Sequence, residues 1–313
     1  MSVSKILENL ITDSRTWDIT LENNKDQFLI EFDSELINEL NEKMAKILDN
    51  NTDNFPLLKK KILKLKDEIL LNGCGFFVIN GSIFHTFSKK EKILIFTIIS
   101  KILGELLPQN KTKDLLVEIK DIGKSMVSGG RYHQTNESGS FHTDGSHIYS
   151  NPPDYIGLVC INQAKNGGES KFVSAYTIHN KMLAKNKELL KILYEKFYHD
   201  RKGEQSIDET PARYEPVFEF KQNKLNFKYQ RELLNTGHEK LNKPFTLAQK
   251  SALDFLDSIL MDENLVVSYR LERGDMMFSN NNWLTHDRNS FEDYEDDNLK
   301  RILVRTWIRD NDN

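Results

Sequence analysis

Cysteine is almost absent from this sequence of 313 residues, which contains only Cys74 and Cys160. The two are far apart and neither belongs to a Cys-x-x-Cys pair. The sequence therefore excludes a disulfide framework and a zinc site built from thiolates. So few cysteines are typical of a reducing compartment, and we expect a cytoplasmic protein.

Long hydrophobic runs and a basic face are also missing. The most apolar segment, residues 93–103, is interrupted by Lys101 and is too short to span a bilayer. Residues 1–13 do not show the basic and then apolar pattern of a secretory signal. The 43 Lys and Arg residues are interspersed with 47 Asp and Glu, for a formal net charge of −4. The sequence therefore favours a small-molecule or protein partner and argues against nucleic acid and membrane partners.

Linkers rich in proline or glycine, internal repeats and low-complexity segments are missing too, so we expect residues 1–313 to form a single domain. Apolar residues at helical spacing, such as Leu58, Ile62 and Leu65, predict that residues 1–70 form a mainly helical N-terminal part. This part is expected to pack on a core formed by residues 71–313.

The core segment alternates between short extended pieces and a few helices. Capping-box pairs at Ser88 with Glu91 and at Thr246 with Gln249 predict the starts of two helices, and a third is expected at 178–198. Aromatic and β-branched residues predict strands at 76–79, 115–119, 155–160, 170–174, 265–271, 276–279 and 301–308, and a hairpin formed by 213–220 and 225–229. Strands that return after long excursions predict an α+β fold built around a double-sheet barrel.

The stretch Gly139-Ser140-Phe141-His142-Thr143-Asp144-Gly145-Ser146 places an imidazole and a carboxylate two positions apart. In an extended chain, side chains at i and i+2 point to the same face, so His142 and Asp144 can reach one centre. Such a pair suits a divalent first-row metal such as iron(II), which commonly takes a second histidine from elsewhere in the fold. Taken alone, the pair is explained equally well as surface hydrogen bonding in a Gly/Ser loop.

A second group of candidate residues lies near the C-terminus. His286 is distant from Asp144 in sequence, but a barrel brings distant strands side by side. In the last predicted strand, Arg301 and Arg305 share a face with Leu303 and Trp307. An arginine directed into a packed interior needs a partner, and its planar fork suits a carboxylate. The alternative is that both arginines pair with the acidic loop 292–297.

Together these motifs resemble those of the iron(II)- and 2-oxoglutarate-dependent oxygenases of the taurine dioxygenase type, in the clavaminate synthase-like superfamily. The motifs are His142-Thr143-Asp144, His286 in an Asn-Asn…His-x-Arg setting, and Arg301-x-x-x-Arg305. Three further stretches agree with landmarks of this family: Leu106-Leu107-Pro108-Gln109-Asn110, Gly167-Gly168-Glu169-Ser170 and Gly274-Asp275. The resemblance covers about residues 70–309.

This resemblance implies a double-stranded β-helix (jelly-roll) core with N-terminal and inserted helices. It also implies an iron(II) site held by His142, Asp144 and His286. Ser170 would donate a hydrogen bond to the distal carboxylate of 2-oxoglutarate, and Arg301 would form a salt bridge with it. Arg305 matches a second arginine that approaches the co-substrate or an anionic group of the prime substrate. Because the spacing from His286 to Arg301 is longer than in the taurine enzyme, Arg305 is the competing candidate for the salt bridge.

The implied reaction consumes O2 and 2-oxoglutarate, releases succinate and CO2, and hydroxylates an unactivated C–H bond of a small molecule. An amino acid, a related metabolite or a carrier-bound intermediate are the expected substrates. Taurine is not predicted, because Asn280-Asn281 stands where many relatives have Asp-Asn. Asp144 indicates hydroxylation or desaturation, because related halogenases replace this carboxylate by a small residue.

Two other classes of function remain open. A zinc hydrolase uses similar ligands, but it would give Arg301, Arg305 and Ser170 no task. A non-catalytic metabolite sensor on the same barrel is the other alternative. The sequence does not indicate which oligomeric state the protein adopts.

Several further polar residues lie near the metal motif or elsewhere in the chain without a clear ligand pattern. Five residues near the metal motif can line a substrate pocket: Arg131, Tyr132, Asn136, Ser138 and His147. For each of them a structural role is the simpler interpretation. Histidines without a companion at ligand spacing are expected to be structural or at the surface, and these are His85, His133, His179, His199 and His238. Residues 204–210 are predicted to form a plain connection, with a mobile loop over the site as the alternative.

Overall fold

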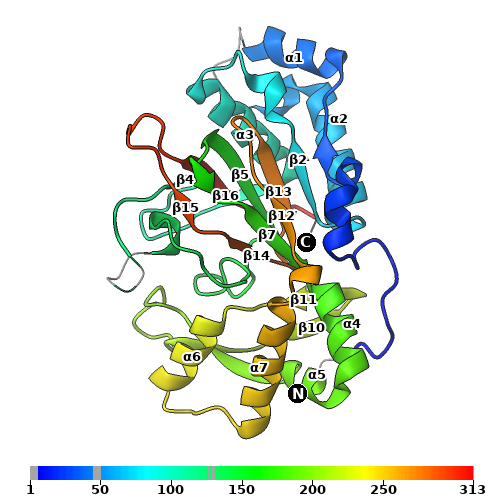
Figure 1. The fold of residues 1–313 in the computed structure, drawn as a ribbon, viewed down its shortest axis with the longest axis vertical. Helices are drawn as coiled ribbons and strands as arrows, with labels where there is room; N and C mark the ends of the chain where they lie inside the picture. Colours follow the sequence, from blue (N-terminus) through cyan, green and yellow to red (C-terminus); the bar gives the residue numbers. More distant parts are fainter. Residues whose placement is uncertain (1–5, 45–50, 126, 128–130, 313) are drawn as a thin grey trace.

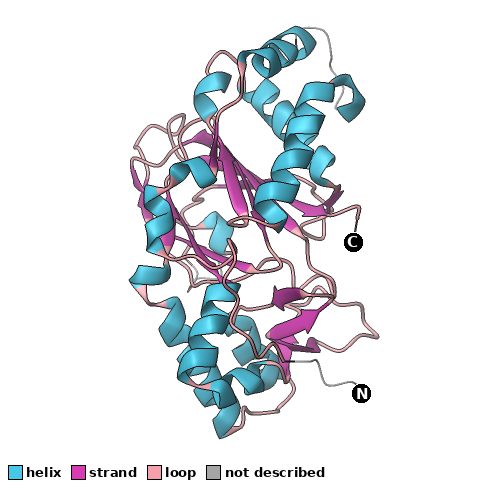
Figure 2. Ribbon diagram, turned by 90° about the vertical axis from the view of Figure 1, so that its right-hand side faces the viewer, coloured by secondary structure: helices cyan, strands magenta, loops and turns pink. Residues whose placement is uncertain are grey.

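The computed structural model describes residues 6–44, 51–125, 127 and 131–312. Strands occupy the middle of the molecule, and helices gather at its two ends (Figure 1). One end holds α1 (Ser34–Met44), α2 (Pro56–Leu65) and α3 (Lys89–Leu103), and the other holds α4 (Ala175–Lys185), α5 (Lys187–Leu193), α6 (Arg231–Lys240) and α7 (Leu247–Leu260). Figure 2 shows the same arrangement after a quarter turn.

The N-terminal helices form as the apolar spacing predicts. Pro56 occupies the first turn of α2, where its missing N–H leaves no hydrogen bond unmade, and Leu58, Ile62 and Leu65 are buried. The helix then continues into a π-helical segment, Lys66–Leu71. Residues 1–5 and 45–50 of the predicted helical part lie outside the described residues.

The larger sheet has the strand order β1-β2-β13-β5-β16-β3, with β4 also paired to β16. Its strands are β1 (Leu29–Ile30), β2 (Phe76–Ile79), β3 (Glu105–Leu107), β4 (Val117–Ile119), β5 (Tyr155–Asn162), β13 (Met276–Asn280) and β16 (Ile302–Arg309). Side chains alternate between its two faces. Phe77, Phe278 and Val304 join an apolar cluster with the helices α1 to α3. Phe76, Met277 and Leu303 belong to a second cluster, on the side of the smaller sheet.

The smaller sheet consists of β12 (Val267–Tyr269), β7 (Ser170–Ser174) and β14 (Leu284–Arg288), with β7 in the centre. Phe172 from β7 stacks on Phe76 from the larger sheet, with their ring centroids 4.7 Å apart. The two sheets thus pack face to face. This arrangement confirms the predicted α+β fold with a jelly-roll core and inserted helices.

Three pairs of short strands complete the described structure. They are β6 (Asn166–Gly167) with β15 (Phe291–Glu292), β8 (Lys196–Asp200) with β9 (Ala212–Pro216), and β10 (Phe218–Lys221) with β11 (Lys224–Phe227). Among the described residues, no helix combines the length and the apolar character needed to cross a membrane.

Both capping boxes are present, at the starts of α3 and α7. The predicted helix 178–198 is divided at Asn186 into α4 and α5 and ends at Leu193, so its last residues are wrongly predicted. Asn186 ends α4, and its side chain accepts a hydrogen bond from Leu189 N to start α5. Residues 196–200 form β8, in which Phe197 and His199 are buried and Lys196 is exposed. The predicted hairpin arm 213–220 is also divided, because β9 pairs with β8 and only β10 pairs with β11.

Candidate active site

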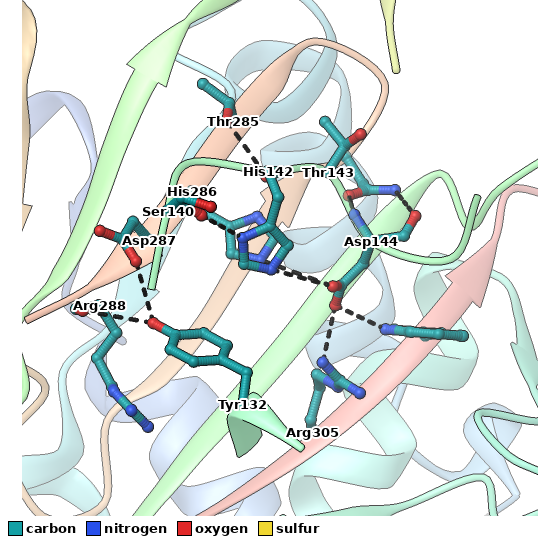
Figure 3. Close-up of polar contacts among 12 residues, drawn as sticks. Tyr132, Ser140, His142, Thr143, Asp144, Thr285, His286, Asp287, Arg288 and Arg305 are labelled. Carbon is teal, nitrogen blue, oxygen red and sulfur yellow. Dashed lines mark hydrogen bonds and ion pairs between the residues drawn. The ribbon is translucent and has the colours of Figure 1, made fainter. Parts of the chain in front are cut away.

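Two histidines from distant parts of the chain form a pair at the edge of the smaller sheet. The backbone N of His142 donates to O of His286 at 3.0 Å, and N of His286 donates to O of His142 at 2.9 Å. Oδ1 of Asp144 lies 3.5 Å from Nε2 of His142 and 3.9 Å from Nε2 of His286. One ligand atom from each of the three side chains lies within 4.8 Å of the other two. The structure therefore brings together the three residues singled out as metal ligands (Figure 3).

The backbone around Asp144 is held on both sides. N of Thr143 donates to O of Tyr229 at 2.8 Å, and Oγ1 of Thr143 accepts from N of Tyr229 at 3.1 Å. The side chain of Asn281 accepts from N of Asp144 at 2.8 Å and donates to its O at 3.0 Å. Gly145 follows with φ +85°, a conformation that favours glycine. These contacts turn Thr143 away from the site and direct the Asp144 carboxylate into it.

The orientation of His142 is fixed by its second ring nitrogen. Nδ1 lies 2.7 Å from the carbonyl oxygen of Ser140, so Nδ1 carries the proton and Nε2 presents a lone pair to the site. The ring of Tyr132 packs edge-on against the imidazole, with the centroids 5.7 Å apart. A metal-binding histidine needs this tautomer.

The Asp144 carboxylate has a different neighbour on each oxygen. Oδ2 accepts hydrogen bonds from Nη1 of Arg305 and from Nε1 of Trp307, both at 2.9 Å. Nε of Arg305 also donates to Oε1 of Gln109 at 2.8 Å, which holds the guanidinium in place. In Figure 3, Arg305 reaches the Asp144 carboxylate from below, and the two imidazoles lie to the left of that carboxylate. Oδ1 is therefore the oxygen that remains for a metal.

Charges set the protonation states of the three candidate ligands. Burial works against an ionised Asp144, but Arg305 and the two histidines hold the pKa of this carboxyl well below its usual range. Burial, together with the neighbouring His142, lowers the pKa of His286 to about 4. Burial opposes protonation of His142 as well, yet the neighbouring Asp144 carboxylate and the carbonyl of Ser140 outweigh this effect and raise its pKa. An ionised Asp144 and a neutral His286 are the states that metal binding requires.

A cavity extends from the two histidines to Ser170 and Arg301, between the two sheets. Arg301 is 4% exposed, and its Nη1 atom is buried without a hydrogen-bond partner in the described part of the chain. Burial and the nearby charge of Arg288 lower the pKa of Arg301 to about 10. Buried guanidinium groups are normally paired, so this end of the cavity is suited to an anion.

The acidic loop 292–297 does not pair with either guanidinium. Arg305 pairs with Asp144, and the contact of Arg301 with this loop is made by its backbone N, which donates to Oδ1 of Asp293 at 2.8 Å. The alternative interpretation of the two arginines is therefore wrong. Arg301 is the arginine left to meet a ligand, while Arg305 is already engaged by a candidate metal ligand.

Sequence reasoning missed several residues of this site. Trp307 and Gln109 contact the Asp144–Arg305 pair, and only the alternation of the last strand pointed to Trp307, which shares a face with Arg305. Asn281 was noted only as a departure from a family pattern. His133, expected to be structural or at the surface, lines the cavity instead. No sequence pattern pointed to His133 or to the role of Gln109.

Comparisons with known proteins agree with this geometry. Residues 47–307 match the family model described as "Taurine catabolism dioxygenase TauD, TfdA family". The chain belongs to the TauD/TfdA family. FR-33289 synthase from Streptomyces rubellomurinus is 31% identical over 280 residues, which cover 88% of this chain and 80% of that protein. The taurine hydroxylase-like protein SAT17 from Stachybotrys chartarum is 26% identical over 270 residues, covering 82% of this chain and 66% of the relative.

Solved structures with the same fold include two iron oxygenases. Asparagine oxygenase in complex with Fe(II), hydroxyasparagine and succinate aligns with a TM-score of 0.68 and 14% identity, covering 90% of this chain and 93% of that chain. The oxygenase OrfP in complex with Fe and α-ketoglutaric acid aligns with a TM-score of 0.68 and 15% identity, over the same shares of the two chains. As a TauD/TfdA protein, the chain is an iron(II)- and 2-oxoglutarate-dependent dioxygenase that also uses O2.

The side chains present fit the groups that the TauD/TfdA family uses. Two imidazoles and one carboxylate oxygen form a donor set that suits iron(II) and leaves coordination positions open. The unpaired Nη1 of Arg301, at the other end of the same cavity, suits the distal carboxylate of 2-oxoglutarate.

Proposed function

We propose that His142, Asp144 and His286 hold the iron(II), and that Ser170 and Arg301 bind the distal carboxylate of 2-oxoglutarate. The observation that carries this assignment is the cavity itself, which joins His142 and His286 to the buried guanidinium of Arg301, whose Nη1 has no hydrogen-bond partner among the described residues. Iron and 2-oxoglutarate, when bound, supply the activation of O2 that releases succinate and CO2. The remaining tasks fall to the side chains of the protein.

Arg305 and Trp307 leave only one carboxylate oxygen of Asp144 free to bind the metal. Because both donate to Oδ2, that oxygen is turned away from the histidines and Oδ1 alone faces them. Monodentate binding by Asp144 preserves the open positions that 2-oxoglutarate and O2 require. The pairing of Arg305 with Asp144 also supports Arg301, rather than Arg305, as the residue that binds the co-substrate.

The walls of the cavity limit access of water to the reacting atoms. Leu158 and Met277 from the larger sheet and Phe172 from the smaller sheet line it. An apolar lining strengthens the charge interactions inside the cavity and protects a reactive intermediate from side reactions.

The prime substrate in this proposal is a small molecule of the amino-acid type that carries an anionic group and is hydroxylated at a C–H bond. His133 lines the cavity, and burial and nearby Arg305 lower its pKa to about 4. The ring of His147 packs against Trp307, with the centroids 6.2 Å apart, and burial lowers the pKa of His147 to about 4 as well. Arg131 acts on both imidazoles in the same direction. Positive charges and neutral hydrogen-bonding groups together favour a carboxylate or a similar anion.

One experiment separates this function from the alternatives. Under anaerobic conditions, iron(II) and 2-oxoglutarate are added to the protein and the visible charge-transfer band is recorded, and air is then admitted and succinate measured. The proposal predicts a band and succinate. If no band forms and zinc supports hydrolysis of esters or amides, the protein is a zinc hydrolase. A band without turnover of any substrate indicates a sensor.

The substrate class needs a matched panel. Amino acids and other small carboxylates and sulfonates are compared with their uncharged amides or esters, and with the same acids linked as pantetheine thioesters. Succinate release that depends on the free anion supports the proposal, and release only with the thioester indicates a carrier-bound substrate. Mass spectrometry of the product distinguishes hydroxylation, a gain of one oxygen, from desaturation, a loss of two hydrogens.

A further inference from the structure

Arg288 lies beside Ser170 and Arg301, the residues proposed to bind the co-substrate. It is the last residue of β14, two positions after His286, so the two side chains point to the same face of the strand. In the antiparallel register of β14 with β7, Arg288 lies directly opposite Ser170. It is 7% exposed and lines the same cavity as Ser170 and Arg301.

The guanidinium of Arg288 is close to that of Arg301. Both pack against the ring of Phe291, with Cζ of Arg288 4.8 Å and Cζ of Arg301 4.9 Å from its centroid. Nε of Arg288 is buried without a hydrogen-bond partner among the described residues, as is Nη1 of Arg301. Each arginine therefore keeps one donor atom for a group that the protein itself does not provide.

Nearby carboxylates do not neutralise these two charges. Asp287 is 3.0 Å from Nζ of Lys171 and accepts a hydrogen bond from the hydroxyl of Tyr132. Asp293 accepts from the backbone N of Arg301 rather than from its side chain. In the part of the chain that the structure describes, neither Arg288 nor Arg301 forms an ion pair within 4.0 Å. Two buried like charges with free donors make this end of the cavity more favourable for an anion than one arginine would.

We propose that Arg288 is a second cationic residue of the co-substrate pocket. With Arg301 it attracts the distal carboxylate of 2-oxoglutarate, and the two charges together set the preference for a 2-oxo dicarboxylic acid over a 2-oxo monocarboxylic acid. The inference rests on the proposed function, because it requires 2-oxoglutarate to bind with its distal carboxylate at this end of the cavity.

Arg288 also has a structural task that a test must separate from this one. Its Nη2 donates to O of Thr135 at 3.0 Å and to O of Glu137 at 2.5 Å, and its Cζ lies 4.7 Å from the ring of Tyr132. A substitution therefore loosens the segment that packs against His142. Loss of this support affects every 2-oxo acid that chelates iron, whereas loss of the charge affects only acids with a distal carboxylate.

The experiment is an anaerobic titration of the iron(II) protein, followed by the charge-transfer band. Two ligands are compared: 2-oxoglutarate, and 2-oxopentanoate, which has the same chelating end but no distal carboxylate. Arg288→Gln should weaken binding of 2-oxoglutarate about ten- to a hundredfold, the range for a charge-assisted hydrogen bond, and should change binding of 2-oxopentanoate far less. Arg288→Lys keeps the charge and should retain most of the preference for 2-oxoglutarate.

Arg270→Gln is the matched control, because Nη2 of Arg270 also donates to backbone carbonyl oxygens, those of Ala164 and Lys165, outside this cavity. It should leave both affinities unchanged. An equal loss for the two ligands in Arg288→Gln, or no loss for either, overturns the proposal. If Arg288→Gln does not fold, Arg288→Met takes its place, because it also removes the charge: a lowered ratio of 2-oxoglutarate to 2-oxopentanoate affinity supports the charge role, and an unchanged ratio contradicts it. Failure of the proposed function itself is distinct, because the wild-type protein would then give no band with either ligand.

Discussion

Trp307 donates its indole N–H to Oδ2 of Asp144 over 2.9 Å, and both side chains are buried. Because Trp307 lies two positions after Arg305 on β16, the two residues reach the same carboxylate oxygen from one face of the strand. The last strand of the larger sheet thus sets the position of a candidate metal ligand that belongs to a distant loop.

Trp307→Phe should weaken the binding of iron(II) about tenfold, the lower end of the range for residues that orient a metal ligand. The ring remains to fill the space, but Oδ2 loses one of its two donors and the carboxylate is less well oriented. Competition with a metal chelator measures the affinity. Trp17→Phe is the matched control, because Nε1 of Trp17 also donates one hydrogen bond, to O of Cys74 at 3.0 Å, away from the site. Equal affinities in Trp307→Phe and the wild type would contradict the assigned role.

Arg301→Gln and Arg305→Gln should each weaken the binding of a different ligand, 2-oxoglutarate in the first variant and iron(II) in the second. Arg301→Gln is expected to weaken 2-oxoglutarate binding by about 1.5–3 kcal/mol, the value of a hydrogen bond to a charged group. Iron binding should change little. Arg305→Gln removes a donor from Asp144 and should mainly weaken iron binding. Anaerobic titrations with each ligand measure both effects. If Arg305→Gln instead weakens 2-oxoglutarate binding and Arg301→Gln does not, Arg305 is the residue that binds the co-substrate.

The three candidate metal ligands could be picked out from the sequence because each stands in a recognisable local pattern. His142 and Asp144 stand two positions apart, and His286 stands in a recognisable order with two arginines. β14, which carries His286, was not predicted as a strand. Its residues Thr285 to Arg288 are polar, and a polar run of this kind is typical of a loop even though the strand is buried here. Functional sites break the apolar pattern on which strand prediction depends.

The contacts around these ligands could not be predicted, because they depend on tertiary register. Gln109 meets Arg305, and His133 enters the cavity, only after strands far apart in the sequence have paired. The division of the predicted helix at Asn186 depends on one side-chain cap, which competes with continuation of the helix.

Gly168→Ala should weaken 2-oxoglutarate binding by displacing Arg301. Gly168 has φ +78°, and an added Cβ would lie 3.1 Å from Nε of Arg301 and 3.5 Å from Cβ of Phe291. The alanine also destabilises the fold by about 1–2 kcal/mol, the cost of a left-handed conformation for a residue with a Cβ. Gly203→Ala separates the loss of stability from the contact with Arg301. Gly203 has the same φ of +78°, but a Cβ added there would meet no atom within 4 Å. Titration should show a loss of co-substrate affinity in Gly168→Ala alone, and equal affinities in the two variants would exclude the contact with Arg301 as a cause.

A buried ion pair links the N-terminal part of the chain to its C-terminal end. Nζ of Lys66 lies 2.5 Å from Oδ1 of Asp310, and the hydroxyl of Tyr155 donates to Oδ2 of Asp310 at 2.5 Å. Burial raises the pKa of Asp310, but Lys66 and Tyr155 outweigh this effect and lower the pKa below its ordinary value of 3.8. A lowered carboxyl pKa means that the folded state binds the proton less tightly than the unfolded state. The stabilisation is therefore fully present above pH 3.8 and is lost as the pH falls through the lower folded pKa.

Asp310→Asn should consequently lower the free energy of unfolding by about 3 kcal/mol at neutral pH, because it leaves the buried Lys66 charge without its main partner. The difference from the wild type should shrink as the pH falls from 3.8 through the lower folded pKa, below which the carboxyl group is protonated in both states. Urea unfolding over a series of pH values measures this trend. Asp312→Asn is the control: Asp312 lies 2.8 Å from the same lysine nitrogen, but its side chain is 83% exposed. Its loss should change stability by less than about 1 kcal/mol. A penalty for Asp310→Asn that persists unchanged in acid would show that lost packing or hydrogen bonding, rather than the carboxylate charge, accounts for its effect.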